Sequence, residues 1–319
     1  MKRRTRPTPV SPLDLSRVRT YPLRTRRSKV AKQLMATPPR KGMPLAGFLR
    51  GLPDILAARD FRAAAEAIAT RHRSAKRIVL GMGAHPIKVG LSPLIIDLME
   101  RGILSAVAMN GAAIIHDFEL AYAGETSEDV AANLADGQFG MAEETGRFLN
   151  GTIAGAAADQ GLGEAVGTQL LKAGFANARL SILAAGARLG IPVTVHVAIG
   201  TDIIHMHPSA DGAAIGAASL RDFRRLAAVV AGLRGGVFIN LGSAVIIPEV
   251  FVKALNLARN VGKRVDRLVT IDMDFIRHYR PGVNIVQRPT AGNGQGYRLT
   301  GHHEIMFPLL CAAVLEYLG

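Results

Sequence analysis

The sequence contains one cysteine, Cys311, and no tryptophan. A single cysteine forms no disulfide within the chain and builds no cysteine metal site, which excludes a disulfide framework. Aromatic residues make up 5% of the chain, whereas hydrophobic residues make up 49%. The apolar content is therefore mainly aliphatic, which is typical of parallel strands buried under helices. The lack of paired cysteines also indicates a reducing compartment, so we expect a cytoplasmic location.

Long apolar runs are also lacking. No stretch of 18 or more uncharged apolar residues occurs, because Arg188 interrupts 180–199 and Arg234 interrupts 226–252. A membrane-spanning helix needs about 20 such residues, so we expect no membrane association. Arg26 and Arg27 resemble a twin-arginine export signal, but the polar residues 28–33 follow them instead of an apolar segment. We therefore predict no export.

Acidic residues are nearly absent from the first 41 positions. This segment holds 13 basic residues and one acid, Asp14, and so carries +12 of the net charge of +14. Six prolines lie among the basic residues, and the apolar content is too low for a core. We predict a basic, Pro/Arg-rich, largely disordered arm over 1–45 and one nearly neutral cofactor-binding α/β domain over 46–319. The arm is either a solvated tail or a contact for RNA, an anionic surface or an acidic partner.

Short apolar segments alternate with amphipathic ones along the domain. Strands are expected at 78–80, 103–109, 192–199, 236–241 and 267–271. Helices are expected at 53–73, 92–101 with Ser92 as N-cap, 180–188 closed by Gly190, 220–233, 248–261 and from about 304. This alternation predicts a Rossmann-like, doubly wound, mainly parallel sheet. Residues 124–176 are expected to be helical with breaks, and 276–301, with two prolines and five glycines, a long loop.

A glycine-rich or polar cluster follows each predicted strand. In open parallel sheets, ligands bind beyond the carboxyl ends of the strands, so we predict one crevice there. The clusters are Gly81, Gly83, His85 and Lys88; Asn110, Gly111, His116 and Asp117; Asp202, His205 and His207; Gly242 and Ser243; and Asp272 and Asp274. Gly81 and Gly83 alone are a weak dinucleotide signal, because Pro86 takes the place of the third glycine.

The histidines are the candidates for acid–base chemistry. His116, His205 and His207 are candidate bases, with Asp117 or Asp202 orienting one of them. Lys88 is a candidate contact for a phosphate or a substrate carboxylate. The set His196, Asp202, His205 and His207 is alternatively a metal site, since imidazole and carboxylate suit zinc, iron or manganese. The run from His302 to Glu304 is interpreted as the start of the last helix.

From about residue 78 to the C-terminus, the order of motifs resembles the deoxyhypusine synthase family. Those enzymes use NAD to oxidise spermidine and transfer its aminobutyl group to a protein lysine. The similar segments are 85–90, 108–113 with 116–119, 190–193 with 201–202, 240–246, 270–272 and 307–310.

The resemblance implies a Rossmann-like domain, NAD as cofactor and a homotetramer with active sites at its interfaces. It implies cofactor contacts by Gly81, Gly83, His85, Lys88, Asn110, Gly111, Asp202, Gly242, Ser243 and Asp272. We predict substrate contacts by Glu119 and Asp274, and catalysis by His116, Asp117, His205 and His207.

The sequence departs from the family at the reacting residue. The family's nucleophilic lysine directly follows the glycine run, a place that falls at or near Ile247 here, and isoleucine cannot form an imine. Lys253 lies about two helical turns further on. We therefore expect an NAD-binding protein without deoxyhypusine synthase activity and, if it is an enzyme, hydride transfer on a small amine or hydroxy substrate. The alternatives are a hydrolase using the metal set above, and a nucleotide-binding scaffold whose arm binds RNA or a partner.

Overall fold

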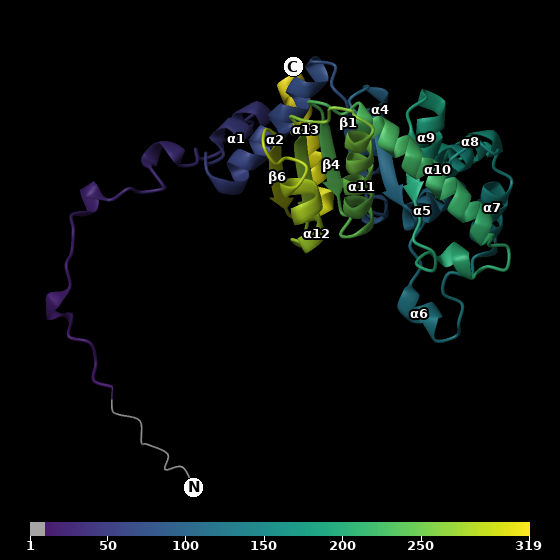
Figure 1. Ribbon diagram of the computed structural model, residues 1–319, viewed down its shortest axis with the longest axis horizontal. Coiled ribbons are helices and arrows are strands. Elements are labelled where there is room, and N and C mark those ends of the chain that lie inside the picture. The colour runs from purple at the N-terminus through teal and green to yellow at the C-terminus, as the bar shows by residue number, and fades with distance from the viewer. Residues whose placement is uncertain (1–9) are drawn as a thin grey trace, which may run out of the picture.

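The computed structural model describes residues 10–319, and a six-stranded sheet lies at its centre (Figure 1). All pairings in the sheet are parallel, and the strand order is β3-β2-β1-β4-β5-β6. The strands are β1 (Ile78–Met82), β2 (Ala106–Asn110), β3 (Val193–His196), β4 (Val237–Leu241), β5 (Val269–Asp274) and β6 (Gln295–Thr300). The order reverses between β1 and β4, so the predicted Rossmann-like doubly wound sheet is confirmed.

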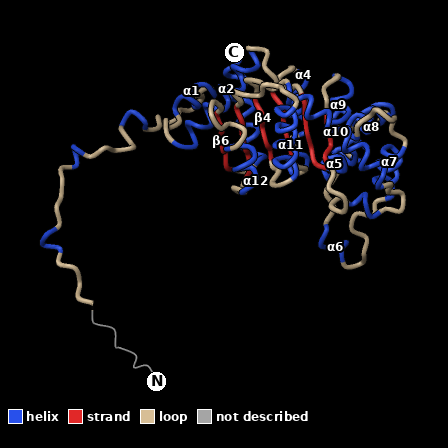
Figure 2. Tube along the Cα trace, viewed as in Figure 1, coloured by secondary structure: helices blue, strands red, loops and turns tan. Residues whose placement is uncertain are grey.

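Helices cover both faces of the sheet (Figure 2). One face packs on helices α2 (Leu56–Arg73), α4 (Ser92–Glu100), α5 (Gly111–Ala123), α8 (Leu162–Ala173), α9 (Ile182–Leu189) and α13 (His303–Leu318). The other face packs on α10 (Gly212–Ala231), α11 (Ile246–Asn260) and a π-helix, Gly282–Gln287. The remaining helices are α1 (Leu45–Gly51), α3 (His85–Lys88), α6 (Val130–Leu134), α7 (Glu143–Ala154) and α12 (Tyr279–Pro281).

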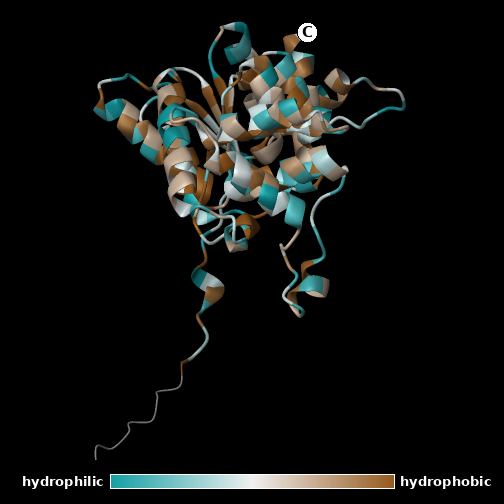
Figure 3. Cartoon of the chain, turned by 90° about the vertical axis from the view of Figure 1, so that its right-hand side faces the viewer, coloured by the Kyte–Doolittle hydropathy of each residue, from teal (hydrophilic) through white to brown (hydrophobic). Residues whose placement is uncertain are grey.

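Alternation along each strand divides the core into two layers. In β1, Leu80 and Met82 belong to the core under α2 and α13, whereas Val79 belongs to the core under α10 and α11. Successive side chains of a strand point to opposite faces, so each strand feeds both layers. Because both faces of β1 to β5 are buried, these strands are mainly apolar rather than alternating, and hydrophobic stretches lie inside the domain in Figure 3.

Two expectations about single elements are wrong. Residues 276–301 are not one long loop, because they contain the π-helix and β6. β6 is an edge strand in which only Leu299 is buried, so its sequence lacks the apolar pattern that marks a strand. Ser92 does not cap α4: Leu91 holds the N-cap position, and the buried Ser92 hydroxyl has no hydrogen-bond partner. Gly190 does end α9, with a φ of 67°.

The basic arm leads into the domain at α1. Its described part, from residue 10, contains three short 3-10 helices without a buried residue, at Leu15–Arg17, Leu23–Thr25 and Lys32–Leu34. Residues 34–37 of the arm contact the domain, since Thr37 N donates to Gly51 O at 2.8 Å and Asp54 N donates to Leu34 O at 3.0 Å. Residues 1–9 of the arm lie outside the described residues, and its disorder and its partner stay predictions. Over the described chain, no helix combines the length and apolar character that a membrane crossing requires.

Candidate functional site

The carboxyl ends of four neighbouring strands form one polar edge. The register pairs Asn110 with His196, and it sets Met82 between Met109 and Leu241. Gly83 N then donates to Leu241 O at 3.1 Å, and Gly242 N donates to Met273 O at 3.0 Å. The residues at or directly after the ends of these strands therefore lie side by side along the edge. They are Asn110, Gly83, Gly242 and Asp274, in that order.

Gly83 and Gly242 bring the ends of β1 and β4 into contact. A Cβ on Gly83 would overlap the carbonyl oxygen of Gly242, so a side chain is excluded there. Gly242 has a φ of 64°, and a Cβ on it would lie 2.7 Å from Cε1 of His303. Both glycines are required by close packing at the point where the strand order reverses. This is the position at which open α/β sheets bind ligands.

Two histidines and an aspartate line this point. His85, the first residue of α3, lies with its Nδ1 2.8 Å from Nδ1 of His303, the first residue of α13. His303 is completely buried, and its Nε2 lies 3.6 Å from Oδ1 of Asp274. Burial lowers the pKa of His303, although the Asp274 carboxylate opposes this shift. His303 is therefore a neutral ring held between a carboxylate and a second imidazole.

A buried amide braces the ends of β4 and β5. Asn240 Nδ2 donates to Asp272 Oδ1 at 2.8 Å and to Ser243 O at 3.0 Å, while Asn240 Oδ1 has no partner among the described side chains and backbone. Burial raises the pKa of Asp272 to about 6, and the hydrogen bond from Asn240 opposes that rise. Ser243 accepts from Ile247 N at 3.2 Å and so stabilises the start of α11. Asn240 was absent from the predicted contacts.

A second group lies at the ends of β2 and β3. The buried Asp202 carboxylate lies against Gly111 at the start of α5, where a Cβ would overlap Asp202 Oδ2. Burial raises the pKa of Asp202 to about 6, and its Oδ2 has no hydrogen-bond partner in the described chain. His205 Nδ1 accepts from Gly200 N at 3.1 Å, so its ring carries the proton on Nε2. That Nε2 is buried and also lacks a partner among the described residues.

A third group lies on the flank formed by α3 and α5. Thr126 Oγ1 donates to Glu119 Oε2 at 2.6 Å and accepts from His116 Nδ1 at 2.7 Å, and Thr145 Oγ1 donates to Glu119 Oε1 at 3.2 Å. Burial, together with the smaller effect of the nearby Lys88 ammonium, lowers the pKa of His116 to about 4. His116 is therefore a neutral ring with Nε2 as its free acceptor. Lys88 and Thr126 line an adjoining hollow of about 520 Å³.

Three of the predicted residues serve packing instead. Gly81 lies within β1, where a side chain would overlap Ile247. Asp117 is completely buried and accepts from Ser181 Oγ, Ile182 N and Leu183 N, so it holds the start of α9 and has no hydrogen bond with His116. His207 donates from Nε2 to Gly140 O at 2.8 Å and packs against Gly146 of α7.

The alternative metal set does not converge. His196 is buried with its Nε2 3.0 Å from Thr194 Oγ1, and burial lowers its pKa to about 3. His207 contacts Gly140, and His205 Nδ1 is taken by backbone N–H groups. Across residues 10–319, no group of three or more His, Cys, Asp or Glu is placed to hold a metal ion. The metal-dependent hydrolase is therefore not carried further.

His303 is the residue that the sequence reasoning missed. It was interpreted as the start of a helix, which it is, but it also lies at the polar edge. The missing signal was β6: once 295–300 is a parallel strand, the residues after it must lie at the same edge as the other clusters.

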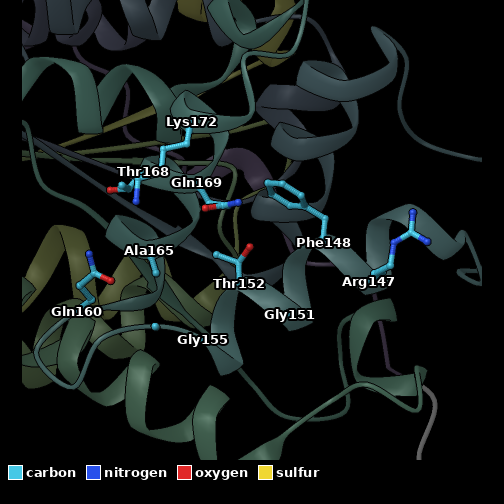
Figure 4. Close-up of a pocket in the computed structure, with 11 residues that line it drawn as sticks. Arg147, Phe148, Gly151, Thr152, Gly155, Gln160, Ala165, Thr168, Gln169 and Lys172 are labelled. Atoms are coloured by element: carbon cyan, nitrogen blue, oxygen red, sulfur yellow. The ribbon is translucent and has the colours of Figure 1, made fainter.

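Other hollows lie away from the polar edge. One of about 410 Å³ lies between α7 and α8, where Arg147, Thr152, Gln169 and Lys172 surround it (Figure 4). Its lining includes none of the residues of the polar edge.

Comparison with known proteins identifies the fold. The sequence matches no family model and no curated protein. A protein from Entamoeba histolytica, provisionally named deoxyhypusine synthase, is 12% identical with a TM-score of 0.53, over 86% of this chain and 94% of that one. A provisionally named LOR/SDH protein from Methanococcus maripaludis S2 is 14% identical with a TM-score of 0.51, over 91% and 75%. The deoxyhypusine-synthase-like fold is therefore shown.

Larger proteins share this fold as one part. A structure of AgrE with ornithine and NAD+ is 13% identical with a TM-score of 0.52 over 82% of this chain. ArgZ, an arginine dihydrolase from cyanobacteria, is 14% identical with a TM-score of 0.52 over 80% of this chain. The chain spans about a third of the length of each, 34% and 31% respectively.

Proposed function

We propose that this protein is a deoxyhypusine-synthase-like, NAD-binding enzyme that performs hydride-transfer chemistry on a small amine or hydroxy substrate. The observation that carries the proposal is the polar edge at the β1–β4 reversal, where Gly83 and Gly242 meet beside His85, His303 and Asp274. An NAD+ complex of AgrE, which shares the fold, supports the choice of cofactor.

The residues at the edge suit a dinucleotide. Asp202 Oδ2 and Asn240 Oδ1 are buried acceptors without a partner in the described chain, and a ligand's hydroxyl or amide groups would satisfy them. We assign Asp202, beside Gly111, to a ribose hydroxyl, and the backbone after Gly83, with Lys88 nearby, to the phosphates. When bound, NAD supplies a hydride acceptor or donor.

Deoxyhypusine synthase activity is excluded from the proposal by the environment of Ile247. Its side chain is completely buried in the core under α10 and α11, against Gly81. Lys253 forms an ion pair with Glu249 and has 61% of its side chain exposed. A lysine at 247 would place a charge in that core, which is costly without a partner.

Cofactor binding is tested by calorimetry on the full chain with NAD+, NADP+ and ADP-ribose. We expect NAD+ to bind, and Asp202→Ala to weaken it about tenfold, because a hydrogen bond to a charged acceptor contributes about 1.5 kcal/mol or more. Glu143→Ala, an exposed α7 residue paired with Arg147, is the matched control and should bind NAD+ as the wild type does. No heat of binding at millimolar NAD+ would remove the cofactor from the proposal.

Turnover is tested with named probes, spermidine and L-ornithine, by following NADH fluorescence.

The homotetramer implied by the family resemblance is part of the proposal and is tested by light scattering of the full chain. A monomer at assay concentration that still turns over would overturn that part alone.

A further inference from the structure

We propose that Asp274 and His303 act as positioning residues that hold His85 in one tautomer, with Nε2 as the free base at the polar edge. The inference deepens the proposed function, on which the catalytic use of His85 rests. None of these three residues was among the predicted bases.

The chain of contacts has a direction. His303 is neutral because it is completely buried, so its ring carries one proton. The Asp274 carboxylate lies 3.6 Å from His303 Nε2, which is too far for a hydrogen bond, and its negative charge favours the proton on that nitrogen. His303 Nδ1 is then an acceptor, and His85 Nδ1, at 2.8 Å, must donate to it.

The consequence falls on the opposite nitrogen of His85. A neutral ring that carries its proton on Nδ1 has a lone pair on Nε2. In the described chain no hydrogen bond engages that Nε2, and the His85 side chain is partly exposed at the β1–β4 reversal. An isolated imidazole favours the other tautomer, with the proton on Nε2, so His303 selects the form that accepts a proton.

The surroundings hold the arrangement in place. The ring of Phe275 lies 5.7 Å from that of His85 and 5.7 Å from that of His303. Phe275 N donates to Asp274 Oδ1 at 2.8 Å, which fixes the carboxylate. The same oxygen therefore accepts from the backbone and faces His303.

The reaction step follows from the tautomer. His85 Nε2 would take the proton from the O–H or N–H bond of a substrate, and the electron pair of that bond would close a C=O or C=N bond. A bound NAD+ would supply the hydride acceptor that this oxidation requires. Protonated His85 retains its Nδ1–H bond to His303, so the charge forms without any rearrangement of the pair.

The tautomers are measured without substrate, by long-range 1H–15N correlation of the histidine rings in the full chain. We expect Nδ1–H at His85 and Nε2–H at His303. Asp274→Asn removes the charge that selects this form and should shift His85 toward Nε2–H, and His303→Ala should complete the shift. His302→Gln, at an adjacent ring with 71% of its side chain exposed, is the control and should leave His85 unchanged.

The outcomes separate this inference from the proposed function. The proposed positioning of His85 is overturned if the wild type carries its His85 proton on Nε2, or if Asp274→Asn leaves the His85 tautomer unchanged. Either result holds whichever cofactor binds. If a probe amine turns over, His85→Ala should lower kcat about 100-fold or more. His303→Ala should lower kcat while changing the NAD+ Kd less than about threefold. If the wild type does not bind NAD+, the proposed function is contradicted, whereas the tautomer result is unaffected.

Discussion

Gly83 and Gly242 allow the ends of β1 and β4 to pack closely, because each leaves room for a neighbouring group. The backbone of Gly242 fills the place of one missing Cβ, and His303 lies 2.7 Å from the other. A methyl group at Gly83 would meet the carbonyl oxygen of Gly242, which has no rotamer to change. The two strand ends would have to move apart.

Gly83→Ala is therefore expected to destabilise the fold by about 1 to 3 kcal/mol and to weaken NAD+ binding. Gly151→Ala is the matched control, because a Cβ there meets nothing within 4 Å. In the α7 helix this control should be neutral or stabilising by up to about 1 kcal/mol. Urea unfolding measures both variants, and equal effects would contradict the packing argument.

Asp202 links stability to pH. Burial raises its pKa from 3.8 in an unperturbed chain to about 6 in the folded protein, so the folded state binds the proton more tightly. The contribution of Asp202 to the free energy of unfolding is fully present below about pH 4, and it is lost as the pH rises through about 6.

Asp202→Asn should remove this dependence, because the amide is neutral at every pH. The free energy of unfolding of the wild type, relative to the variant, should fall by roughly 1 to 3 kcal/mol between pH 4 and pH 7. Urea titrations of the wild type and the variant at the same pH remove the pH dependence that the other ionisable groups contribute to both. A constant difference across this range would show that Asp202 is not desolvated in the folded state.

At the scale of elements, one carboxylate ties the edge strand β3 to two helices. Asp222 of α10 is completely buried, and its Oδ2 accepts from Val195 N at 2.9 Å and from Gly163 N of α8 at 2.8 Å. The outer N–H of β3 is thus satisfied by a side chain. This protects an edge that would otherwise be open to pairing with another strand.

Asp222→Ala should destabilise the protein by about 2 to 4 kcal/mol, because two buried N–H groups lose their acceptor. Asp222→Asn keeps an acceptor oxygen and should cost less. Hydrogen exchange at Val195 and Gly163 is the measurement, with faster exchange expected in the alanine variant. Unchanged hydrogen-exchange protection at both amides would show that other contacts hold β3 to the two helices.

The elements also show where sequence patterns are sufficient. β1 to β5 are buried on both faces and read as apolar runs, so their pattern was enough to place them. β6 is mostly exposed, and a π-helix precedes it, so neither has a pattern that local reasoning recognises. Because β6 was not predicted, His303 was not placed at the polar edge. The position of a residue that follows a strand can be inferred only when that strand is known.

At the scale of the whole molecule, charge is divided between the arm and the domain. Residues 1–33 carry 11 of the 13 basic residues of the first 41, whereas contacts to the domain begin at Leu34. The described part of the arm, from residue 10, lies away from the layered domain in Figure 1. It is therefore available to an anionic partner without affecting the fold.

Deletion of residues 1–33 should leave the Tm within about 2 °C of the wild type and should remove binding to heparin or single-stranded RNA. The wild-type affinity, if electrostatic, should fall steeply as salt rises. His205→Ala should retain the binding. RNA binding that survives the deletion would place the nucleic-acid contact on the domain.

The sequence by itself determined the alternation of strands and helices, the parallel sheet and the edge at which polar residues gather, because burial and turn chemistry act locally. It also identified the absence of a lysine near Ile247. Only the tertiary structure decided which of those polar residues meet. Asp117 and His207 hold neighbouring backbone instead of meeting at the polar edge. In contrast, three separate segments bring together His85, His303 and Asp274. The reason is that strand order and register are set by contacts between segments far apart in the chain.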